Sequence, residues 1–483
     1  MNAFQKHPIQ NLQKKANLEK KIVKAEGWIH SHWILSLVAL VLGLLTLKGV
    51  YGNVQSGHPI SVKQIFMQAV GNGLETDGLG HTNILLLGVG GEGHDGENLT
   101  DTMIVATLDD SQNTVTMVSL PRDMYVKNER VGWGGRLNGI YELIYEEAED
   151  PVDAEAVLEE QIEEIMGIDI QYYAKIDFAG FKEIVDAVGG ITVDVTEVIA
   201  DDFYPADPES GHTYDPFYLS TGTHTFDGET ALKYVRSRHN TSDFSRALRQ
   251  QEVLQALKDQ ALSLGVLTSP SKVKDVYFAI SNNFETNLSL TELLSLADFA
   301  SDLEKDSIQS AVISDAAYET GGFLYTPERE EGDPYYLVPF AGDFSEFAQF
   351  AQVFLYHPEL SKDAVSIQVL NGTKTESLAG LTKMMLVRYG FNAIDPGNAE
   401  SKDFEKTQIY VRQQSSNTEA SKAEQIKIEN TARLLPLLID GEISADLPPS
   451  LAANSDAEIV IVLGADFAEY YKEHSELFYI GFY

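Results

Sequence analysis

The alternation of apolar and polar residues predicts strands and helices in mixed order along most of the chain. Residues 84–88 form an apolar run that predicts a buried strand. The apolar runs 103–108 and 114–120 flank the polar sequence DDSQN, which predicts a β-hairpin. Residues 191–198 alternate apolar and polar positions and predict a further strand. The glycine-containing run 133–136 predicts a second hairpin or a lid loop.

Helical periodicity covers several longer segments of the chain. A glycine pair ends the segment that begins at Phe178, and Ser242 or Asp243 starts a long one. Residues 200–225 are rich in Pro, Asp, Gly and Tyr and predict a loop. The predicted helices span 137–149, 154–166, 178–190, 243–264, 270–281 and 289–304.

The last part of the chain repeats strand and helix patterns on a smaller scale. Strands are predicted at 367–373, 408–412 and 457–464, and helices at 376–389 and 423–438. Such alternation predicts a small, separate α/β domain.

The N-terminal part of the chain has a different pattern. Residues 1–27 carry six lysines and two glutamates, a local charge of +4. The apolar zone 28–51 that follows is long enough for the ~20 residues that a membrane-spanning helix needs. The lysines before it predict a cytoplasmic N-terminus and an extracytoplasmic remainder. A cleaved signal peptide is the alternative, which the long basic lead and the lack of an A-x-A site disfavour.

Composition excludes several classes of function. The 483 residues include no cysteine, which rules out disulfides, thiolate catalysis and cysteine-based zinc sites. The 35 Lys+Arg face 73 Asp+Glu, a net charge of -38, which argues against a nucleic-acid partner. Four arginines nevertheless gather within 234–252, and this local concentration predicts an anion site.

The predicted hairpin brings two charged residues together. Antiparallel pairing about a centre between Ser111 and Gln112 places Asp101 and Arg122 at the same open end. A loop position on a rigid scaffold often carries function. A structural salt bridge at a sheet edge is the alternative interpretation.

The arginine-rich segment 234–252 offers two further arrangements. If YVRSR is a strand, Arg236 and Arg238 point to one face, where an anion would relieve their repulsion. The alternative is a solvated face with separate carboxylate partners. On the following helix, Asp243, Arg246 and Gln250 fall in the sector of the apolar residues, with Arg249 at its edge.

Charges that point toward a core must pair with each other or line a polar cavity, because burying an unpaired charge is costly. A cavity of arginines and aspartates suits a diphosphate with a divalent cation. Asp101 is the first choice of metal ligand, and Asp243 is a ligand, a base or an orienter of arginine. The loop 88–98 is glycine-rich but lacks the lysine of a Walker A motif, so its glycines indicate tight turns and close backbone approach. His94 and Asp95 in this loop are weaker metal candidates.

Several spaced motifs resemble those of the LytR-CpsA-Psr family. They are NILLLG, TDTMIVATLD, VSLPRDMYV, RLNGIYE, DAVGGITVDV, FDGETALKYVRSR and DFSRALRQQ, in family order across residues 80–310. VLNGT and RYGF resemble the LytR C-terminal domain that often follows. The resemblance implies an α/β fold: a mixed sheet flanked by helices, an N-terminal transmembrane helix and a small C-terminal α/β domain. The implied parts are a basic tail 1–27, an anchor 28–51, a stalk 52–79, a catalytic domain 80–324, a linker 325–362, a C-terminal domain 363–470 and a tail 471–483.

The resemblance implies a membrane-anchored phosphotransferase acting outside the cytoplasm. It would move an anionic glycopolymer from a polyprenyl diphosphate carrier to the 6-hydroxyl of N-acetylmuramic acid in peptidoglycan, with Mg²⁺ or Mn²⁺ as cofactor. Asp101 is then a metal ligand, and Arg122, Asp243, Arg236 and Arg238 are the catalytic candidates. The implied diphosphate-binding residues are Arg122, Arg136, Arg236, Arg238, Arg246, Arg249 and Gln250.

One motif departs from the family pattern. Where the family has G-x-D-x-R, with a second metal-binding aspartate, this chain has Gly-Val-Gly-Gly at 88–91. Glu92 or Asp95 is the expected substitute. Two alternative functions stay open: a polyprenyl diphosphate phosphatase, with water as acceptor, and a non-catalytic binder of polyprenyl-linked glycans.

Overall fold

The computed structural model describes ten stretches of the chain: 73–94, 96–147, 154–206, 213–237, 243–304, 307–330, 332–357, 360, 365–413 and 418–478. The predicted membrane anchor lies outside these residues. Among the helices within the described stretches, none has both the length and the apolar character that a bilayer crossing requires.

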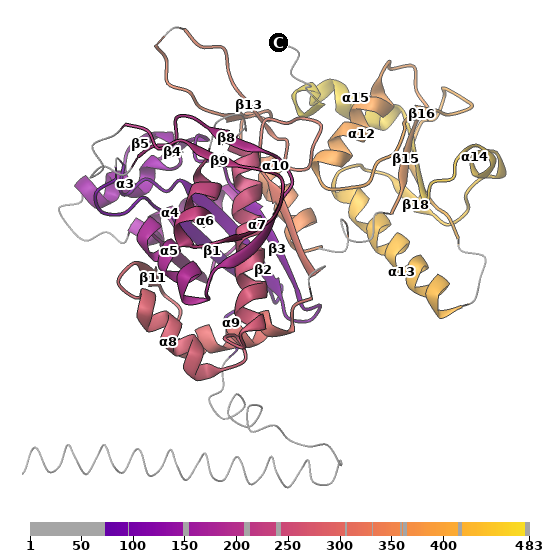
Figure 1. Cartoon of the computed structure of the whole chain (residues 1–483). Helices are drawn as coiled ribbons and strands as arrows, with labels where there is room; N and C mark the ends of the chain where they lie inside the picture. The colour runs from indigo at the N-terminus through magenta and orange to yellow at the C-terminus, as the bar shows by residue number, and fades with distance from the viewer. Residues whose placement is uncertain are drawn as a thin grey trace, which may run out of the picture. The chain divides into compact units, whose positions relative to one another are not determined.

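A mixed six-stranded sheet forms the centre of the larger α/β part, in the order β11-β6-β1-β2-β3-β12 (Figure 1). The pairs β1–β6 and β3–β12 are parallel, and the other neighbours are antiparallel. The strands are β1 (Thr82–Gly88), β2 (Thr102–Asp109), β3 (Thr114–Ser119), β6 (Tyr172–Ile176), β11 (Phe284–Thr286) and β12 (Ile308–Val312).

The β2–β3 hairpin has the register that its sequence predicts. Ile104 lies opposite Ser119, and Asp109 lies opposite Thr114 at the turn. Nearly every residue of both strands is buried, because helices cover both faces of the sheet. That burial explains why these strands read as continuous apolar runs rather than as alternating ones.

Helices are present at all six predicted segments; the bounds of 154–166 match, and the other five helices are slightly shorter than predicted. Asp177 caps the first turn of α5, and Asp227 caps that of α6. The long α7 packs on the sheet, where Gln251 Nε2 donates to Ser119 Oγ at 3.0 Å. The helices are α3 (Gly139–Glu147), α4 (Ala154–Met166), α5 (Phe178–Ala187), α6 (Gly228–Arg236), α7 (Asp243–Ser263), α8 (Pro270–Ile280) and α9 (Leu290–Asp302).

Two sequence predictions differ from the structure. The segment beginning at Tyr234, considered above as a strand, is the end of helix α6, because the Asp227 cap starts a helix that buries Ala231, Leu232 and Val235. The predicted loop 200–225 contains three short strands, β8 (Ile199–Asp201), β9 (Phe217–Leu219) and β10 (Gly222–Phe226). Their partners are each other and β7 (Ile191–Val195), and such distant pairing leaves no short-range signal.

Smaller elements surround the sheet. The run 133–136 forms the predicted hairpin, in which β5 (Trp133–Arg136) pairs with β4 (Tyr125–Asn128). After β12 the chain forms β13 (Leu324–Tyr325), β14 (Val338–Pro339), α10 (Ser345–Phe350) and the π-helical turn η3 (Ala351–Leu355).

The C-terminal α/β part has its own five-stranded sheet, in the order β16-β15-β19-β17-β18. All the strands and helices predicted for it from the sequence are present, and Gly390 at φ 91° ends α12. The strands are β15 (Ile367–Asn371), β16 (Gly397–Asn398), β17 (Gln408–Val411), β18 (Glu442–Ser444) and β19 (Ile459–Leu463). The helical segments are α12 (Leu378–Arg388), α13 (Glu419–Leu434), η4 (Leu435–Leu437), α14 (Pro449–Asn454), α15 (Ala465–Glu473) and η5 (Ser475–Phe478).

Candidate functional site

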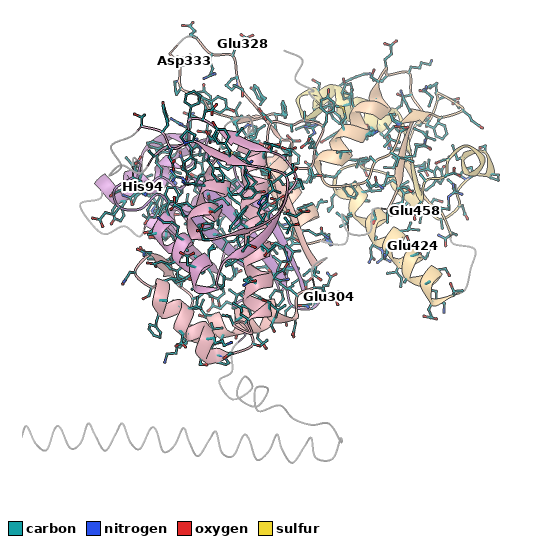
Figure 2. The ribbon with its side chains drawn as sticks, viewed as in Figure 1. His94, Glu304, Glu328, Asp333, Glu424 and Glu458 are labelled. Carbon is teal, nitrogen blue, oxygen red and sulfur yellow. The ribbon has the colours of Figure 1, made fainter. Side chains whose placement is uncertain are left out.

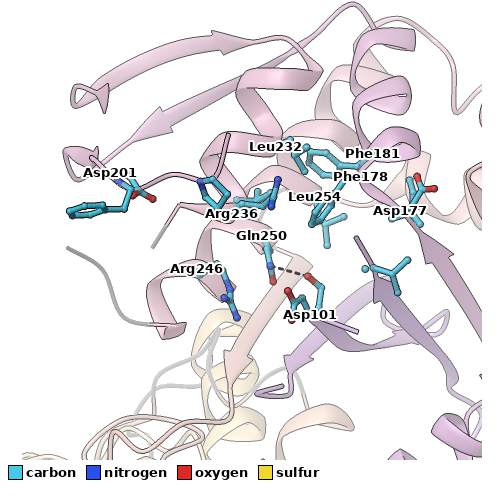
Figure 3. Close-up of a pocket in the computed structure, with 17 residues that line it drawn as sticks. Asp101, Asp177, Phe178, Phe181, Asp201, Leu232, Arg236, Arg246, Gln250 and Leu254 are labelled. Carbon is cyan, nitrogen blue, oxygen red and sulfur yellow. Dashed lines mark hydrogen bonds between the residues drawn. The ribbon is translucent and has the colours of Figure 1, made fainter. Parts of the chain in front are cut away.

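A cavity of about 460 Å³ lies where β1 and β2 meet the helices α5, α6 and α7 (Figure 3). Its wall combines carboxylates, guanidinium groups and apolar side chains, which is an unusual mixture for a core. The carboxylates are Asp101, Asp177 and Asp201, and the arginines are Arg236 and Arg246. The apolar side chains include Phe178, Phe181, Leu232, Val235 and Leu254.

Asp101 and Arg122 meet at the open end of the β2–β3 hairpin, as the sequence predicts. Arg122 Nη1 donates to Asp101 Oδ1 at 2.8 Å, and Asn138 Nδ2 donates to the same oxygen at 3.4 Å. The Asp101 side chain is 37% exposed and the Arg122 side chain 15%. Asp101 lines the cavity, whereas Arg122 lines a second cavity beside it. A ligand in the first cavity can therefore reach this pair at the Asp101 carboxylate.

Arg236 is held at the cavity by aromatic side chains. Its guanidinium carbon lies 4.0 Å from the centre of the Phe178 ring and 5.5 Å from that of Tyr204. Arg236 Nη1 also donates to Tyr204 Oη at 3.3 Å. Burial raises the pKa of Tyr204 to about 12 even though the charge of Arg236 opposes the shift. The hydroxyl therefore stays neutral, and these contacts fix the direction of the Arg236 cation.

Helix α7 presents Arg246 and Gln250 to the cavity, as helical periodicity predicts. Arg246 is only 8% exposed. Gln250 Nε2 donates to Thr102 Oγ1 at 2.9 Å, which ties the helix to strand β2 (Figure 3). A Cβ on Gly88 would lie 2.9 Å from Thr102 Cβ, so the side chain of Thr102 fits here because residue 88 is a glycine. Polar residues thus point inward at the start of α7, on the face that buries apolar residues in its later turns.

Arg249 occupies a different environment from Arg246. It is 6% exposed and is not among the residues that line the cavity. Its guanidinium donates to the carbonyls of Tyr234, at 2.9 Å, and of Ser237. These carbonyls belong to the end of α6, beside Arg236. Burial lowers the pKa of Arg249, and nearby groups such as Tyr234 oppose that shift. These hydrogen bonds of Arg249 therefore hold in place the end of α6, which carries Arg236.

The remaining predicted site residues are spread more widely. Arg136 lies on β5, where Arg136 Nη1 is 3.1 Å from Asp123 Oδ1, and it lines the second cavity. Glu92 is exposed and lines neither cavity. Arg238 and Asp95 lie outside the described residues, as does the side chain of Asp243 at the start of α7.

The glycine-rich loop passes close to the start of α5. Gly91 has φ +81°, and a Cβ there would lie 2.8 Å from Asp177 Cβ. His94 lies in the same loop (Figure 2). Its ring packs edge-on against that of Phe178, with ring centres 5.0 Å apart. The glycines thus permit a turn and a close backbone approach, as the sequence predicts.

Sequence reasoning did not find two carboxylates of the cavity, Asp177 and Asp201. Asp177 Oδ1 accepts from Gly180 N at 2.8 Å, so its sequence signal is that of a helix cap. Asp201 Oδ2 accepts from Ser237 Oγ at 2.9 Å and sits in a segment that reads as loop. Neither signal distinguishes a cavity residue from an ordinary cap or turn.

The donor set limits how a divalent cation can bind. Within the described part of the chain, no group of three His, Cys, Asp or Glu side chains is arranged to hold a metal ion. Asp101 supplies one carboxylate at the cavity wall. Mg²⁺ commonly takes one or two carboxylates and completes its shell with substrate phosphates and water. The residues present therefore fit a cation that binds together with a phosphate substrate.

Two family models match the chain. The LytR_cpsA_psr family model matches residues 55–333, and the model described as LytR cell envelope-related transcriptional attenuator matches residues 364–467.

Individual relatives have modest identity over long spans. The cell wall biosynthesis protein LcpA of Corynebacterium glutamicum is 25% identical over 433 residues, covering 83% of this chain and 76% of LcpA. The polyisoprenyl-teichoic acid–peptidoglycan teichoic acid transferase TagT of Bacillus subtilis is 27% identical, covering 65% of this chain and 94% of TagT. Among solved structures, Bacillus subtilis TagV has a TM-score of 0.44 and 27% identity, covering 56% of this chain and 96% of TagV.

Proposed function

Because the chain belongs to the LytR_cpsA_psr family, we propose that it transfers an anionic glycopolymer from a polyprenyl diphosphate carrier to peptidoglycan. Relatives that align with most of their length are named as polyisoprenyl-teichoic acid–peptidoglycan teichoic acid transferases. The proposed acceptor atom is the 6-hydroxyl of N-acetylmuramic acid.

One observation carries the proposal: a single cavity holds arginines, carboxylates and an apolar wall together. Arg236 and Arg246 supply cations that are fixed in a largely buried site. Guanidinium groups match phosphate oxygens in geometry and charge. Phe178, Phe181 and Leu254 provide an apolar surface in the same cavity, which suits the isoprenoid part of a lipid diphosphate.

The proposed reaction is an in-line displacement at phosphorus. The acceptor oxygen forms a bond to the phosphorus that carries the glycopolymer. The bond from that phosphorus to the bridging oxygen breaks, and polyprenyl monophosphate leaves with the electron pair. The product is a phosphodiester, and the hydroxyl proton passes to a base, for which Asp243 is the candidate. Arginines at 122, 236, 238 and 246 would neutralise charge on the phosphoryl oxygens.

Arg249 is assigned a supporting part in this proposal. The sequence motif places it with the diphosphate-binding residues, but its contacts are with carbonyls at the end of α6. We infer that it positions Arg236, while Gln250 positions Thr102 at the floor of the cavity.

Mg²⁺ or Mn²⁺ is the proposed cofactor, with Asp101 as its protein ligand. When bound, such a cation draws negative charge from the diphosphate oxygens. Asp101 is prepared for this by Arg122 and Asn138, which fix its Oδ1 atom. Glu92 and Asp95 remain candidates for a second carboxylate in place of the missing family aspartate.

We further propose that residues 28–51 anchor the chain in the membrane with the N-terminus inside. The proposed catalytic domain, 80–324, and C-terminal domain, 363–470, would then lie outside, separated by a linker at 325–362. This topology gives the cavity access to a carrier lipid and to the cell wall.

The deciding experiment uses the full-length chain in detergent with Mg²⁺, a short-chain polyprenyl diphosphate saccharide and soluble peptidoglycan fragments. Mass spectrometry should detect a fragment that has gained the phosphosaccharide, and polyprenyl monophosphate in equal amount. Release of monophosphate without a fragment adduct would favour the phosphatase. Binding of the lipid with neither product would favour the non-catalytic binder.

A further inference from the structure

A second cavity, of about 400 Å³, adjoins the first through the Asp101–Arg122 pair. Asp101 lines the first cavity and Arg122 lines the second, and the two side chains are 2.8 Å apart. A group bound in the second cavity thus lies next to the proposed reaction centre. We call it the aromatic cavity, after the side chains Tyr125, Trp133, Tyr335 and Tyr336 in its wall.

Trp133 is a fixed platform in this cavity. Its Nε1 donates to the carbonyl of Arg136 at 3.1 Å. A Cβ on Gly135 would lie 2.8 Å from the indole ring, and one on Gly139 would lie 2.6 Å from it. Two glycines of the sequence WGGRLNG, Gly135 and Gly139, therefore leave the space that the indole fills. An aromatic side chain held in one orientation binds a ligand with little loss of conformational entropy.

A segment distant in sequence completes the aromatic wall. Tyr125 N donates to the carbonyl of Leu337 at 2.8 Å, and Leu337 N donates to that of Asp123 at 2.9 Å. This pairing brings Tyr336 against Tyr125, with ring centres 5.3 Å apart. Two segments of the chain thus supply aromatic faces to one cavity, and the backbone pairing holds them in register.

The cations of the aromatic cavity are organised by one buried carboxylate. Asp123 is 5% exposed, and its two oxygens contact Arg122 Nε at 3.4 Å and Arg136 Nη1 at 3.1 Å. The Arg136 side chain remains 48% exposed. Asp123 therefore helps to hold Arg122 against Asp101, at the boundary of the two cavities, and Arg136 at the wall of the second.

Aromatic faces beside fixed polar groups suit a sugar ring. The C–H face of a pyranose packs on an aromatic ring through dispersion and loss of water, while its hydroxyls need hydrogen-bonding partners at the rim. Arginine also binds carboxylates, such as those on the peptides of peptidoglycan. An isoprenoid chain would instead leave Arg122, Arg136 and Glu142 of this wall without water or polar partners from the ligand.

We propose that the aromatic cavity binds a pyranose ring of the peptidoglycan acceptor and directs its hydroxyl toward the Asp101–Arg122 pair. This inference rests on the proposed function. It makes Trp133, Tyr125 and Tyr336 acceptor-binding residues and makes Asp123 a positioning residue, and it separates the acceptor from the carrier lipid in the first cavity.

The first test observes binding at Trp133 directly. The chain has three tryptophans, so replacing Trp28 and Trp33 by phenylalanine leaves Trp133 as the only tryptophan, whose emission is excited selectively at wavelengths that tyrosine does not absorb. Titrating this full-length variant with a soluble disaccharide-peptide of peptidoglycan should change the emission saturably. Added polyprenyl diphosphate should not displace the fragment. An emission that does not respond, or a response that polyprenyl diphosphate abolishes by competition, would overturn the inference.

The second test uses transfer kinetics. Trp133→Ala should raise the KM for the peptidoglycan fragment about tenfold and leave the affinity for polyprenyl diphosphate unchanged. Trp133→Tyr should recover most of the loss. Tyr336→Ala, on the other segment, should reproduce the effect even if Trp133→Ala folds poorly. Tyr318→Ala is the matched control, because Tyr318 is 60% exposed and lines neither cavity.

The outcomes separate this inference from the proposed function. Wild-type transfer with an unchanged acceptor KM in both aromatic variants, or with a weakened lipid affinity instead, would overturn the inference alone. An absence of transfer by the wild type, together with a saturable Trp133 response, would overturn the proposed activity and support the acceptor site.

Discussion

Arg122 Nη1 lies 2.8 Å from Asp101 Oδ1, across the open end of the β2–β3 hairpin. Each side chain also faces a different cavity, so the pair forms the boundary between them. Arg122 contacts the carboxylate that lines the first cavity and itself lines the second. A ligand in either cavity can therefore contact this pair.

Arg122→Ala should remove most of the transfer activity. The guanidinium would stabilise charge in the transition state, and loss of one such donor typically costs about 10²–10³ in kcat. Arg238→Ala is expected to act in the same direction. Arg433→Ala, which removes an exposed arginine of α13, is the control and should match the wild type. Steady-state turnover of the lipid diphosphate is the measurement, and undiminished turnover in both active-site variants would refute the assignment.

Asp101→Asn should make activity more dependent on divalent cation. The amide keeps the size of the side chain but loses the charge that a Mg²⁺ ligand needs. We expect chelation to stop turnover by the wild type and the variant to need a higher Mg²⁺ concentration for half-maximal rate. Identical Mg²⁺ titration curves for the two proteins would remove Asp101 from the metal site.

Arg249→Met should destabilise the protein as well as reduce activity. The substitution leaves the carbonyls of Tyr234 and Ser237 without their guanidinium donor in a buried site. An unsatisfied buried group costs about 1–3 kcal/mol, so the thermal midpoint of unfolding should fall. Because the same turn carries Arg236, we also expect weaker binding of the lipid diphosphate. A variant with wild-type stability would contradict the structural role proposed for Arg249.

Glu155→Gln should destabilise the protein in a pH-dependent way. The Glu155 carboxylate contacts Lys175, which also lies 3.0 Å from Glu285. Burial alone would raise the pKa of Glu155, but the hydrogen bond and charge of Lys175 outweigh it and hold that pKa below its ordinary value. The same contacts raise the pKa of Lys175 against the effect of its burial.

The sign of the pH effect follows from these shifts. A carboxyl with a depressed folded-state pKa stabilises the fold above its unfolded pKa of about 4.3 and loses this contribution as pH falls through the folded value. The gap in the free energy of unfolding between wild type and Glu155→Gln should therefore be largest near neutral pH, at up to about 3 kcal/mol, and should narrow in acid. A gap that is independent of pH would contradict the pairing. Glu160→Gln, on the exposed side of the same helix, is the matched control, since its partner Arg130 is also exposed.

Local sequence patterns were sufficient for much of the framework and for part of the candidate site. The meeting of Asp101 with Arg122 follows from hairpin symmetry, because antiparallel strands joined by a short turn pair residues equidistant from it. The inward direction of Arg246 and Gln250 follows from helical periodicity, since the later apolar residues of α7 mark its buried face.

Other features depend on contacts between distant segments. The residues at the end of α6 can be read as a strand, and the helix that Asp227 caps, with its burial and the donors of Arg249, decides the conformation. Asp177 and Asp201 carry the signals of a cap and a turn, and their place in the cavity depends on how α5 and β8 meet other parts of the fold, such as the end of α6 that carries Ser237.

By itself, the sequence determined most of the helices, the pairing of the β2–β3 hairpin and the buried face of α7, because these depend on neighbours within a few residues. Only the tertiary structure decided that Arg249 faces carbonyls rather than the cavity, and that Tyr336 reaches Tyr125 to complete a second cavity. Such contacts join segments whose separation in sequence carries no periodic signal, and burial and backbone pairing in the folded chain select them.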